Sequence, residues 1–461
     1  MFSSITYVER RDQLKKEMKT GVILLLGNDP SPVNYTANAY PFRQDSSFLY
    51  YIGIDQPELA VLLDLDEGRE ILFGNEAGLD DIIWTGPKPV LKEQAQAAGL
   101  HEVLPLDRLE EQLTGIKSQN RPVHFLPPYR PENMLKLFRI FKIHSSEAKQ
   151  SASLALIKAV IKQRSIKSAE ELAELDKAVD LTGRLHLEAM RLAKPGLRES
   201  DIAAALHQIA LANGPGFSFM IATVHGEILH NTDYSHVLQQ GELLLVDAGT
   251  ECHSHYSGDI TRTFPVGKKY LPKQKEIYKI VFAAYQAVVA GLRPGVRYLD
   301  LHLLAGRTIA EGLKALGCMQ GNLEEAVRQG AHALFFPHGL GHMLGLDVHD
   351  MEDLGEDHIG YTDQLKRSTQ FGLKSLRLAR ELEAGFAITV EPGIYFIPEL
   401  IKKWKAEKLF KDFINYAKVE TYIDVRGIRI EDNYAITATG SRLLGSPVPK
   451  QIDEIETLRT S

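Results

Sequence analysis

The sequence predicts two domains, a smaller α/β domain at residues 1–160 and a larger α+β domain at residues 161–461. A chain of 461 residues is longer than one ordinary hydrophobic core accommodates. Strand-like and helix-like segments alternate in the first part, whereas longer helices and separate strand-like runs make up the second. The content of 44% hydrophobic and 25% charged residues is typical of a soluble globular protein.

Short apolar runs define the elements of the first domain. Residues 4–19 indicate a helix, and residues 21–27 (GVILLLG) indicate a buried strand. Residues 59–68 and 70–74 predict a hairpin with its turn at Asp66, Glu67 and Gly68. Residues 123–128 (VHFLPP) predict a further strand, which completes the expected α/β domain.

A helix start signal opens the second domain. Ser168 and Glu171 form a capping-box pattern, and apolar residues continue from there at helical spacing until Pro195 and Gly196. Further helices are expected from residue 199 onward, at 274–291 and at 299–316. Strand-like runs occupy 242–249, 386–393 and 428–437, and the polar, basic stretch 398–420 is expected to be a helical surface insertion.

Composition excludes several classes of protein. The formal net charge is −7 and no long Lys/Arg block stands out, so nucleic acid is not an expected partner. Cys252 and Cys318 cannot build a disulfide framework or a CxxC metal site, which favours a reduced, cytoplasmic setting. The charged N-terminal stretch lacks the apolar segment of a signal peptide, and no run of about 18 apolar residues predicts a membrane span.

Residues 338–350 (HGLGHMLGLDVHD) place three histidines and two aspartates within thirteen positions. His338 and His342 have the spacing of the HExxH zinc-protease helix, but that helix needs a glutamate where this chain has Gly339. Gly341 and Gly345 also disfavour a helix. We therefore expect a loop, and any metal site must take its remaining ligands from elsewhere in the chain.

Four carboxylates stand where apolar runs stop. Asp247 ends one run, Glu391 ends another and is followed by Pro-Gly, and Glu431 lies in IRIED. Asp259 follows Asp247 by twelve residues, a separation that a hairpin can close. Any one of these acids is by itself more commonly a turn or cap residue.

Taken as a set with one histidine, the four acids favour a dinuclear metal site. Their combined charge of −4 would cause strong repulsion or protonation if they were buried together, and two divalent cations would balance it. Oxygen-rich ligation with one imidazole suits Mn²⁺, Co²⁺ or Fe²⁺ better than a structural zinc site. Such a pair of ions can share a bridging water and convert it into a hydroxide nucleophile.

One arginine belongs to the same pattern. Arg429 and Glu431 are two residues apart in a strand-like run, so both are expected to point to the same face. An arginine beside a ligating carboxylate can orient it, although an exposed ion pair between strands fits the pattern equally well.

The order of five motifs resembles the proline-specific metallopeptidases, aminopeptidase P and Xaa-Pro dipeptidase (prolidase). The motifs are LLLVDAG, GDITRTFPVG, HGLGHMLGLDVHD, TVEPGIYF and GIRIEDN, and residues 39–63 resemble the N-terminal domain of that family. The resemblance implies a catalytic domain of the α+β pita-bread fold preceded by a smaller α/β domain. It also implies that two metal ions, with Mn²⁺ expected, are ligated by Asp247, Asp259, His342, Glu391 and Glu431.

The resemblance assigns further roles. His338 and His349 are implied to touch the substrate and stabilise the tetrahedral intermediate, and His230 to lie near the substrate. Arg429 matches the family arginine two residues before the last ligand. Trp84 matches a tryptophan that reaches the active site of a neighbouring subunit, which implies a homodimer or homotetramer. Without the resemblance, His230 fits a core histidine, His349 a turn cap and Trp84 ordinary packing.

The chain departs from the family pattern at one place. Asp247 and Asp259 are twelve residues apart, whereas the family spacing is eleven. A one-residue bulge between the two aspartates is expected to absorb the difference.

Both activities of the family hydrolyse the bond before proline, in Xaa-Pro peptides, through a metal-bridging hydroxide. Residues 372–401 resemble the dipeptidases, and Arg377 matches the arginine that binds the substrate carboxylate there; by itself it fits a surface arginine at a helix end. Residues 40–53 resemble aminopeptidase P at least as well. The sequence therefore favours a dipeptidase, with an aminopeptidase acting on longer peptides as the alternative and a non-catalytic binding protein as the third.

Overall fold

The computed structural model describes residues 2–460, which divide into two compact units. The first contains the chain up to Arg164 together with Met351–His358, and the second contains Ser165–Asp350 and the chain from Ile359 onward. The return of eight residues to the first unit is a tertiary feature that no local sequence pattern indicates.

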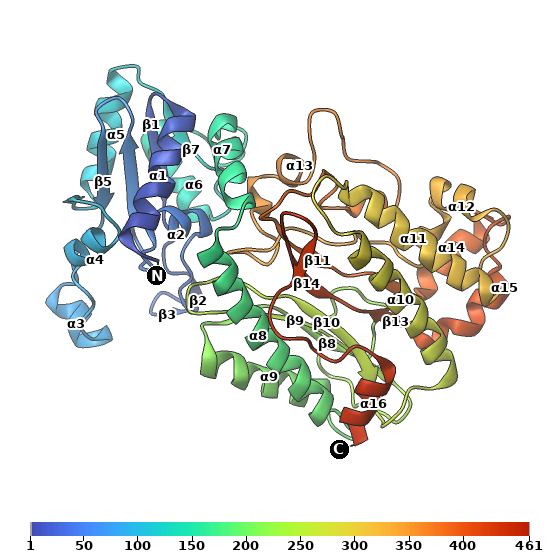
Figure 1. Cartoon of the computed structure of the whole chain (residues 1–461). Coiled ribbons are helices and arrows are strands. Elements are labelled where there is room, and N and C mark those ends of the chain that lie inside the picture. Colours follow the sequence, from blue (N-terminus) through green and yellow to red (C-terminus); the bar gives the residue numbers. More distant parts are fainter. Residues whose placement is uncertain (1, 461) are drawn as a thin grey trace. The chain divides into compact units, whose positions relative to one another are not determined.

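The first unit is an α/β domain around a mixed five-stranded sheet with the order β6-β5-β4-β1-β7 (Figure 1). The strands are β1 (Val22–Leu26), β4 (Ala60–Asp64), β5 (Arg69–Phe73), β6 (Glu102–Leu104) and β7 (Val123–Phe125). Strand β1 is antiparallel to β4 and parallel to β7, and the expected hairpin is formed by β4 and β5. The short strands β2 (Pro32–Tyr35) and β3 (Asn38–Ala39) pair separately.

Seven helices accompany these strands in the described chain up to residue 165. They are α1 (Ser4–Met18), α2 (Ser46–Ile52), α3 (Leu79–Thr85), α4 (Leu91–Ala97), α5 (Arg108–Ser118), α6 (Pro131–Phe141) and α7 (Leu154–Ser165). Apolar residues of the strands pack against α5 and α6 in one core, in which Leu24, Leu62 and Leu113 are fully buried. Helix α3 differs from the rest because it buries none of its residues.

The second unit is built on three antiparallel strands, with the order β10-β9-β8. These are β8 (Gly216–Thr223), β9 (Leu243–Glu251) and β10 (Ile260–Pro265). Strand β11 (Ala387–Val390) pairs with β14 (Asp432–Ile436), which also pairs with β15 (Ser441–Leu443). Strands β12 (Gly393–Tyr395) and β13 (Gly427–Arg429) form a further antiparallel pair.

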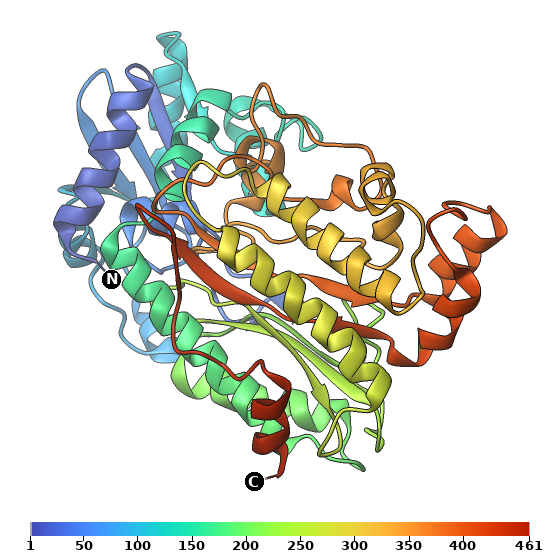
Figure 2. The ribbon, with the colours of Figure 1, turned by 45° about the vertical axis from the view of Figure 1, so that its right-hand side comes forward.

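Long helices flank these strands. Helices α8 (Ala169–Leu192) and α9 (Glu199–Asn213) run along the β8–β10 sheet, while α10 (Pro272–Gly291) and α11 (Tyr298–Ala315) lie side by side near β11 and β13 (Figures 1 and 2). The predicted capping box is confirmed, because the Ser168 hydroxyl accepts from the Glu171 N–H at 3.2 Å and the Glu171 carboxylate accepts from the Ser168 N–H at 3.0 Å. Helix α16 (Ile452–Thr460) ends the described chain.

The predicted insertion is partly helical, with α14 (Pro398–Ala406), α15 (Tyr416–Val419) and a 3₁₀ segment at Glu420–Val425. Its apolar residues Ile401 and Trp404 are buried. Shorter elements precede it: α12 (Leu323–Gln329), α13 (Glu356–Ile359) and the 3₁₀ turns at Ala331–Leu334, Glu352–Leu354 and Leu373–Ser375. Among residues 2–460, no helix has the length and apolar character needed to cross a membrane.

The hairpin of β9 and β10 places Asp247 and Asp259 on one face. Asp247 is opposite Thr261, and the pairing keeps a single register from Pro265 back to the bridge between Glu251 and Ser257. Side chains alternate along a strand, so Asp259, two residues before Thr261, faces the same side as Asp247. The bulge expected between the two aspartates lies in the turn of this hairpin, where His255 has a φ of 66°, its N–H donates to the Cys252 carbonyl oxygen at 2.8 Å and the Cys252 N–H donates to the Tyr256 carbonyl oxygen at 3.0 Å. In a three-residue loop that ends in a left-handed residue, two residues oppose one, which is a one-residue bulge, and the strand pairing beyond the turn keeps one register.

A second junction brings the C-terminal strands to this hairpin. Strand β13 ends at Arg429 and β14 begins at Asp432, so the chain changes its pairing partner across Ile430 and Glu431. At this point Glu431 forms a bridge with Thr261, and its N–H donates to the Thr261 carbonyl oxygen at 3.0 Å. Residues about 170 positions apart in the chain thus become neighbours.

Candidate metal centre

The structure brings the five predicted metal ligands together from separate segments. Asp247 belongs to β9, Asp259 precedes β10, Glu391 follows β11 and Glu431 lies between β13 and β14, while His342 lies in the loop before residue 350. Four of them are between 2% and 7% exposed, and the Glu391 side chain is 17% exposed. Ligand atoms of Asp259, His342 and Glu431 lie within 4.8 Å of one another.

His342 presents an unprotonated ring nitrogen to the carboxylates. Its Nδ1 lies 2.9 Å from the Met343 carbonyl oxygen, which can only accept, so Nδ1 carries the proton. Burial lowers the pKa of His342, which keeps the imidazole neutral and leaves a lone pair on Nε2. Nε2 lies 3.3 Å from Asp259 Oδ2 and 3.7 Å from Glu391 Oε1. A lone pair that faces two carboxyl groups requires a cation or a proton between them.

The pKa values of the buried acids are raised, and a bound cation would remove the cause. Burial, reinforced by repulsion from Asp247, raises the pKa of Asp259 well above its usual value. Burial, reinforced by Asp259 and Glu391, does the same for Glu431, and burial raises the pKa of Glu391 to about 7. Two buried carboxylate oxygens, Asp259 Oδ1 and Glu431 Oε1, have no hydrogen-bond partner. These unpartnered oxygens and the free imidazole nitrogen fit a bound divalent metal.

Thr261 and Arg429 orient the carboxylates of Glu431 and Asp247 through hydrogen bonds. The Thr261 hydroxyl donates to Glu431 Oε2 at 2.6 Å and accepts from Arg429 Nε at 3.0 Å, while Arg429 Nη2 donates to Asp247 Oδ2. Arg429 and Glu431 therefore face the same side, as predicted, and both are buried, which excludes an exposed ion pair. The carboxylate that Arg429 contacts is that of Asp247 rather than that of Glu431.

Arg429 also connects the metal ligands to His338 through Tyr395. Arg429 Nη1 donates to the Tyr395 hydroxyl at 2.8 Å, and that hydroxyl lies 2.9 Å from His338 Nε2. His338 Nδ1 donates to the Gly339 carbonyl oxygen at 2.7 Å, and burial lowers the pKa of His338 to about 3, so Nε2 accepts the proton of the tyrosine. Both ring nitrogens of His338 are thus engaged.

His349, His230 and Arg377 were also predicted as site residues. The ring of His349 packs against that of His342 with centroids 4.4 Å apart. His230 is only partly buried, and its ring packs edge-on against that of Phe219. This partial burial lowers the pKa of His230, while the charge of Asp247 acts in the opposite direction. Arg377 is half-buried in the loop after the Leu373–Ser375 turn, and its charge also acts on His342.

Trp84 belongs to the first unit, whereas the residues described above belong to the second. It belongs to α3 and is 85% exposed, with Ile83 and Leu79 also exposed beside it. Ordinary packing inside the chain therefore does not account for this side chain.

Two residues that contact the predicted site residues, Tyr395 and Asn433, were not predicted from the sequence. Tyr395 lies in GIYF, four residues after Glu391, and only the pairing of β12 with β13 brings its hydroxyl to Arg429. Asn433 accepts from the Asp259 N–H at 3.0 Å and donates to the Asp259 carbonyl oxygen. Alternation from Glu431 along the strand could have indicated Asn433, whereas no local signal indicates Tyr395.

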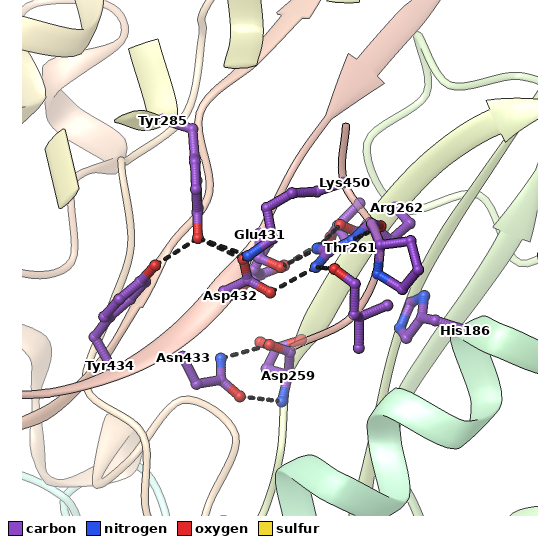
Figure 3. A network of polar contacts seen from close by, with 12 residues as sticks. His186, Asp259, Thr261, Arg262, Tyr285, Glu431, Asp432, Asn433, Tyr434 and Lys450 are labelled. Atoms are coloured by element: carbon purple, nitrogen blue, oxygen red, sulfur yellow. Dashed lines mark hydrogen bonds and ion pairs between the residues drawn. The ribbon is translucent and has the colours of Figure 1, made fainter. Parts of the chain in front are cut away.

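A buried charged network supports the same strands (Figure 3). Arg262 is fully buried and donates to the carbonyl oxygens of Thr261 and Glu431 and, at 2.7 Å, to Asp432 Oδ1. Asp432 Oδ2 accepts from Tyr285 at 2.5 Å and from Lys450. This network holds the backbone on both sides of the Thr261–Glu431 bridge.

Comparisons with known proteins agree with this geometry. Residues 173–438 match the model of metallopeptidase family M24, and residues 7–124 match that of the aminopeptidase P N-terminal domain. The Xaa-Pro aminopeptidase of Escherichia coli is 30% identical, covering 98% of this chain and 97% of the relative. The human Xaa-Pro dipeptidase is 28% identical, covering 94% and 88%.

Solved structures give the same relationship. Zinc-substituted E. coli aminopeptidase P in complex with product has a TM-score of 0.81 at 29% identity and covers 100% of this chain and 98% of its own. Pseudomonas aeruginosa aminopeptidase PepP has a TM-score of 0.80 at 28% identity with the same coverage. The expected resemblance and the two-domain mixed α/β architecture are thereby confirmed, and the chain belongs to metallopeptidase family M24, with an aminopeptidase P N-terminal domain before its catalytic domain.

Proposed function

We propose that this protein is a metal-dependent Xaa-Pro aminopeptidase, which removes the first residue from peptides with proline in second position. The observation that carries the metal dependence is the lone pair of His342 Nε2 directed at Asp259 and Glu391, beside two unpartnered carboxylate oxygens. Full-length relatives named for Xaa-Pro peptides support the substrate class.

Five residues would hold two divalent ions, with Mn²⁺ as the proposed metal. They are Asp247, Asp259, His342, Glu391 and Glu431. When bound there, two such ions would supply Lewis-acid chemistry, which lowers the pKa of a water molecule and polarises a substrate carbonyl group. The residues that the chain itself contributes then bind the peptide, hold the carboxylate ligands in place and move protons.

Glu391 is proposed to act as general base. It is the most exposed of the five, and a general base must be able to reach the proton that it takes up. His349, whose ring packs against that of His342, is proposed to stabilise the oxyanion, with His230 contacting the substrate nearby. His338 and Arg429 would set the position of the Tyr395 hydroxyl between them.

The choice between aminopeptidase and dipeptidase reverses the preference drawn from sequence. Most of the similar full-length relatives are named Xaa-Pro aminopeptidase, including those of E. coli and Botryotinia fuckeliana. The solved structures with TM-scores near 0.8 are aminopeptidases as well. Arg377 could still bind a substrate carboxylate, since its charge reaches His230 and His342.

Hydrolysis of two matched substrates tests the proposal. The manganese-supplemented protein is given an Xaa-Pro dipeptide and the same peptide extended by one residue after proline. We expect efficient release of the first residue from the longer peptide. Cleavage of the dipeptide alone would instead identify a dipeptidase. The control for Arg377 is Arg367, whose guanidinium donates to the carbonyl oxygens of Lys374 and Leu376. Loss of dipeptide cleavage in Arg377→Met but not in Arg367→Met would assign Arg377 to the carboxylate. No cleavage of either peptide would favour a binding protein.

Assembly and location complete the proposal. The exposed Trp84 on α3 supports a homodimer or homotetramer in which α3 contacts another copy. Two free, buried cysteines are compatible with a cytoplasmic protein.

A further inference from the structure

A lysine and an aspartate form a buried ion pair behind the loop that carries His342 and His349. Lys167 Nζ lies 2.8 Å from Asp350 Oδ2, and each side chain is only 1% exposed. Because desolvation offsets much of the attraction in such a pair, it contributes little net stability. The ion pair instead fixes the position of the loop that contains Asp350.

Asp350 is hydrogen-bonded to the carbonyl group that orients His342. The Asp350 N–H donates to the Met343 carbonyl oxygen at 3.0 Å, and His342 Nδ1 donates to the same oxygen at 2.9 Å. A displacement of Asp350 therefore displaces the acceptor that selects the tautomer of His342 and directs its Nε2 toward Asp259 and Glu391. Asp350 also directly follows His349, whose ring packs against that of His342.

The carboxylate of Asp350 packs on the backbone of the same loop. A Cβ atom added at Gly345 would lie 2.3 Å from Asp350 Oδ2, so only glycine permits this approach. The Gly345 carbonyl oxygen accepts from the Ser257 N–H at 2.9 Å, in the hairpin between β9 and β10. The loop is thus closed around Asp350 and attached to the hairpin that carries Asp247 and Asp259.

Lys167 is itself held firmly at its own position. Its N–H donates to the Gly385 carbonyl oxygen at 2.8 Å, and the next residue, Ser168, caps α8. After Asp350 the chain leaves the second unit for Met351–His358. Lys167 therefore holds the loop at Asp350, the residue at which this segment of the second unit ends.

We propose that Lys167 is a positioning residue for the metal centre, acting through Asp350 and the Met343 carbonyl group on His342 and His349. The inference rests on the proposed metal site. It predicts that removing the ammonium group weakens metal binding although Lys167 is not one of the five proposed ligands. Changes to groups that orient a metal ligand typically lower metal affinity about 10- to 100-fold.

The experiment compares manganese affinity, measured by calorimetry on the full-length folded protein, for the native protein, Lys167→Met and Lys136→Met. Lys136 forms a lysine–aspartate pair of similar length with Asp29, at 2.6 Å, in the first unit. We expect Lys167→Met to bind Mn²⁺ about 10- to 100-fold more weakly and to lose kcat, and Lys136→Met to match the native protein. Native-like affinity in folded Lys167→Met would overturn the inference.

Two further results separate the possible failures. If Lys167→Met does not fold, Lys167→Met/Asp350→Asn replaces it, because this variant removes both charges of the pair. Unchanged manganese affinity in the folded double variant would equally overturn the inference. If the native protein itself binds no Mn²⁺, the proposed metal site fails and the inference fails with it. Weakened binding in Lys136→Met to the same extent would show a general effect of lost stability and would refute a specific role for Lys167.

Discussion

Replacement of Thr261 by valine isolates one hydroxyl group at the centre of the site. The change preserves the shape of the side chain and its preference for a strand. The hydroxyl touches two charged groups, because it donates to Glu431 Oε2 at 2.6 Å and accepts from Arg429 Nε at 3.0 Å. Thr261 is fully buried, so water does not replace these contacts from bulk solvent.

The expected loss follows from the nature of these contacts. A hydrogen bond to a charged group contributes about 1.5–3 kcal/mol, and a buried charge that loses it keeps its desolvation cost. One such bond orients the Glu431 carboxylate as a metal ligand. Its removal is therefore expected to weaken manganese binding and to lower kcat/KM by roughly 10- to 150-fold, since about 1.4 kcal/mol corresponds to a factor of ten.

Thr263→Val is the matched control, because Thr263 lies two residues along the same strand and is equally buried. Its hydroxyl donates to the Arg429 carbonyl oxygen and accepts from the Arg429 N–H, both at 3.1 Å, so it touches backbone only. Thr263→Val is expected to lose about 0.5–1.5 kcal/mol of stability per bond and to keep its manganese affinity.

The assay is calorimetric titration of Mn²⁺ into each variant, with kcat and KM measured on an Xaa-Pro-containing tripeptide. Manganese affinity and kcat/KM within twofold of native in Thr261→Val would refute the reasoning that the hydroxyl orients Glu431. Equal losses in both variants would assign the effect to strand stability instead.

Three further outcomes are expected. Tyr395→Phe removes the hydroxyl between Arg429 Nη1 and His338 Nε2 and should lower kcat roughly tenfold or more in steady-state kinetics, while circular dichroism shows a normal fold. An unchanged kcat would contradict the role given to that hydroxyl. Burial lowers the pKa of His302 to about 3, so the unfolded chain takes up the proton before the folded chain and stability falls as the pH drops below about 6.5. In urea titrations, the native protein should lose about 2 kcal/mol more stability between pH 7.5 and pH 5 than His302→Phe, and an equal loss in both proteins would rule this out. Trp84→Ala should shift the protein to a smaller assembly in light scattering while circular dichroism shows a retained fold, whereas an unchanged mass would remove Trp84 from the interface.

Local patterns in the sequence were enough to predict most of the elements and to single out the four candidate carboxylates, whereas the choice of His342 among three histidines came from the family resemblance. Period-two alternation and apolar runs depend only on neighbouring residues, as does the Ser168 capping box, so they indicated β9, β11 and α8 directly. Acids at the ends of apolar runs, with the motif order, then singled out Asp247 and Glu391.

Only the tertiary structure decided how these groups are held. The tautomer of His342 depends on the Met343 carbonyl group, whose position depends on Asp350 and, 183 residues earlier, on Lys167. The path from Arg429 to His338 exists because β13 pairs with β12 and places Tyr395 beside both. Such contacts join residues far apart in the chain, and their geometry depends on the packing of whole elements rather than on local propensity. The sequence therefore determined which chemical groups the site contains, and the tertiary structure determined how they are arranged.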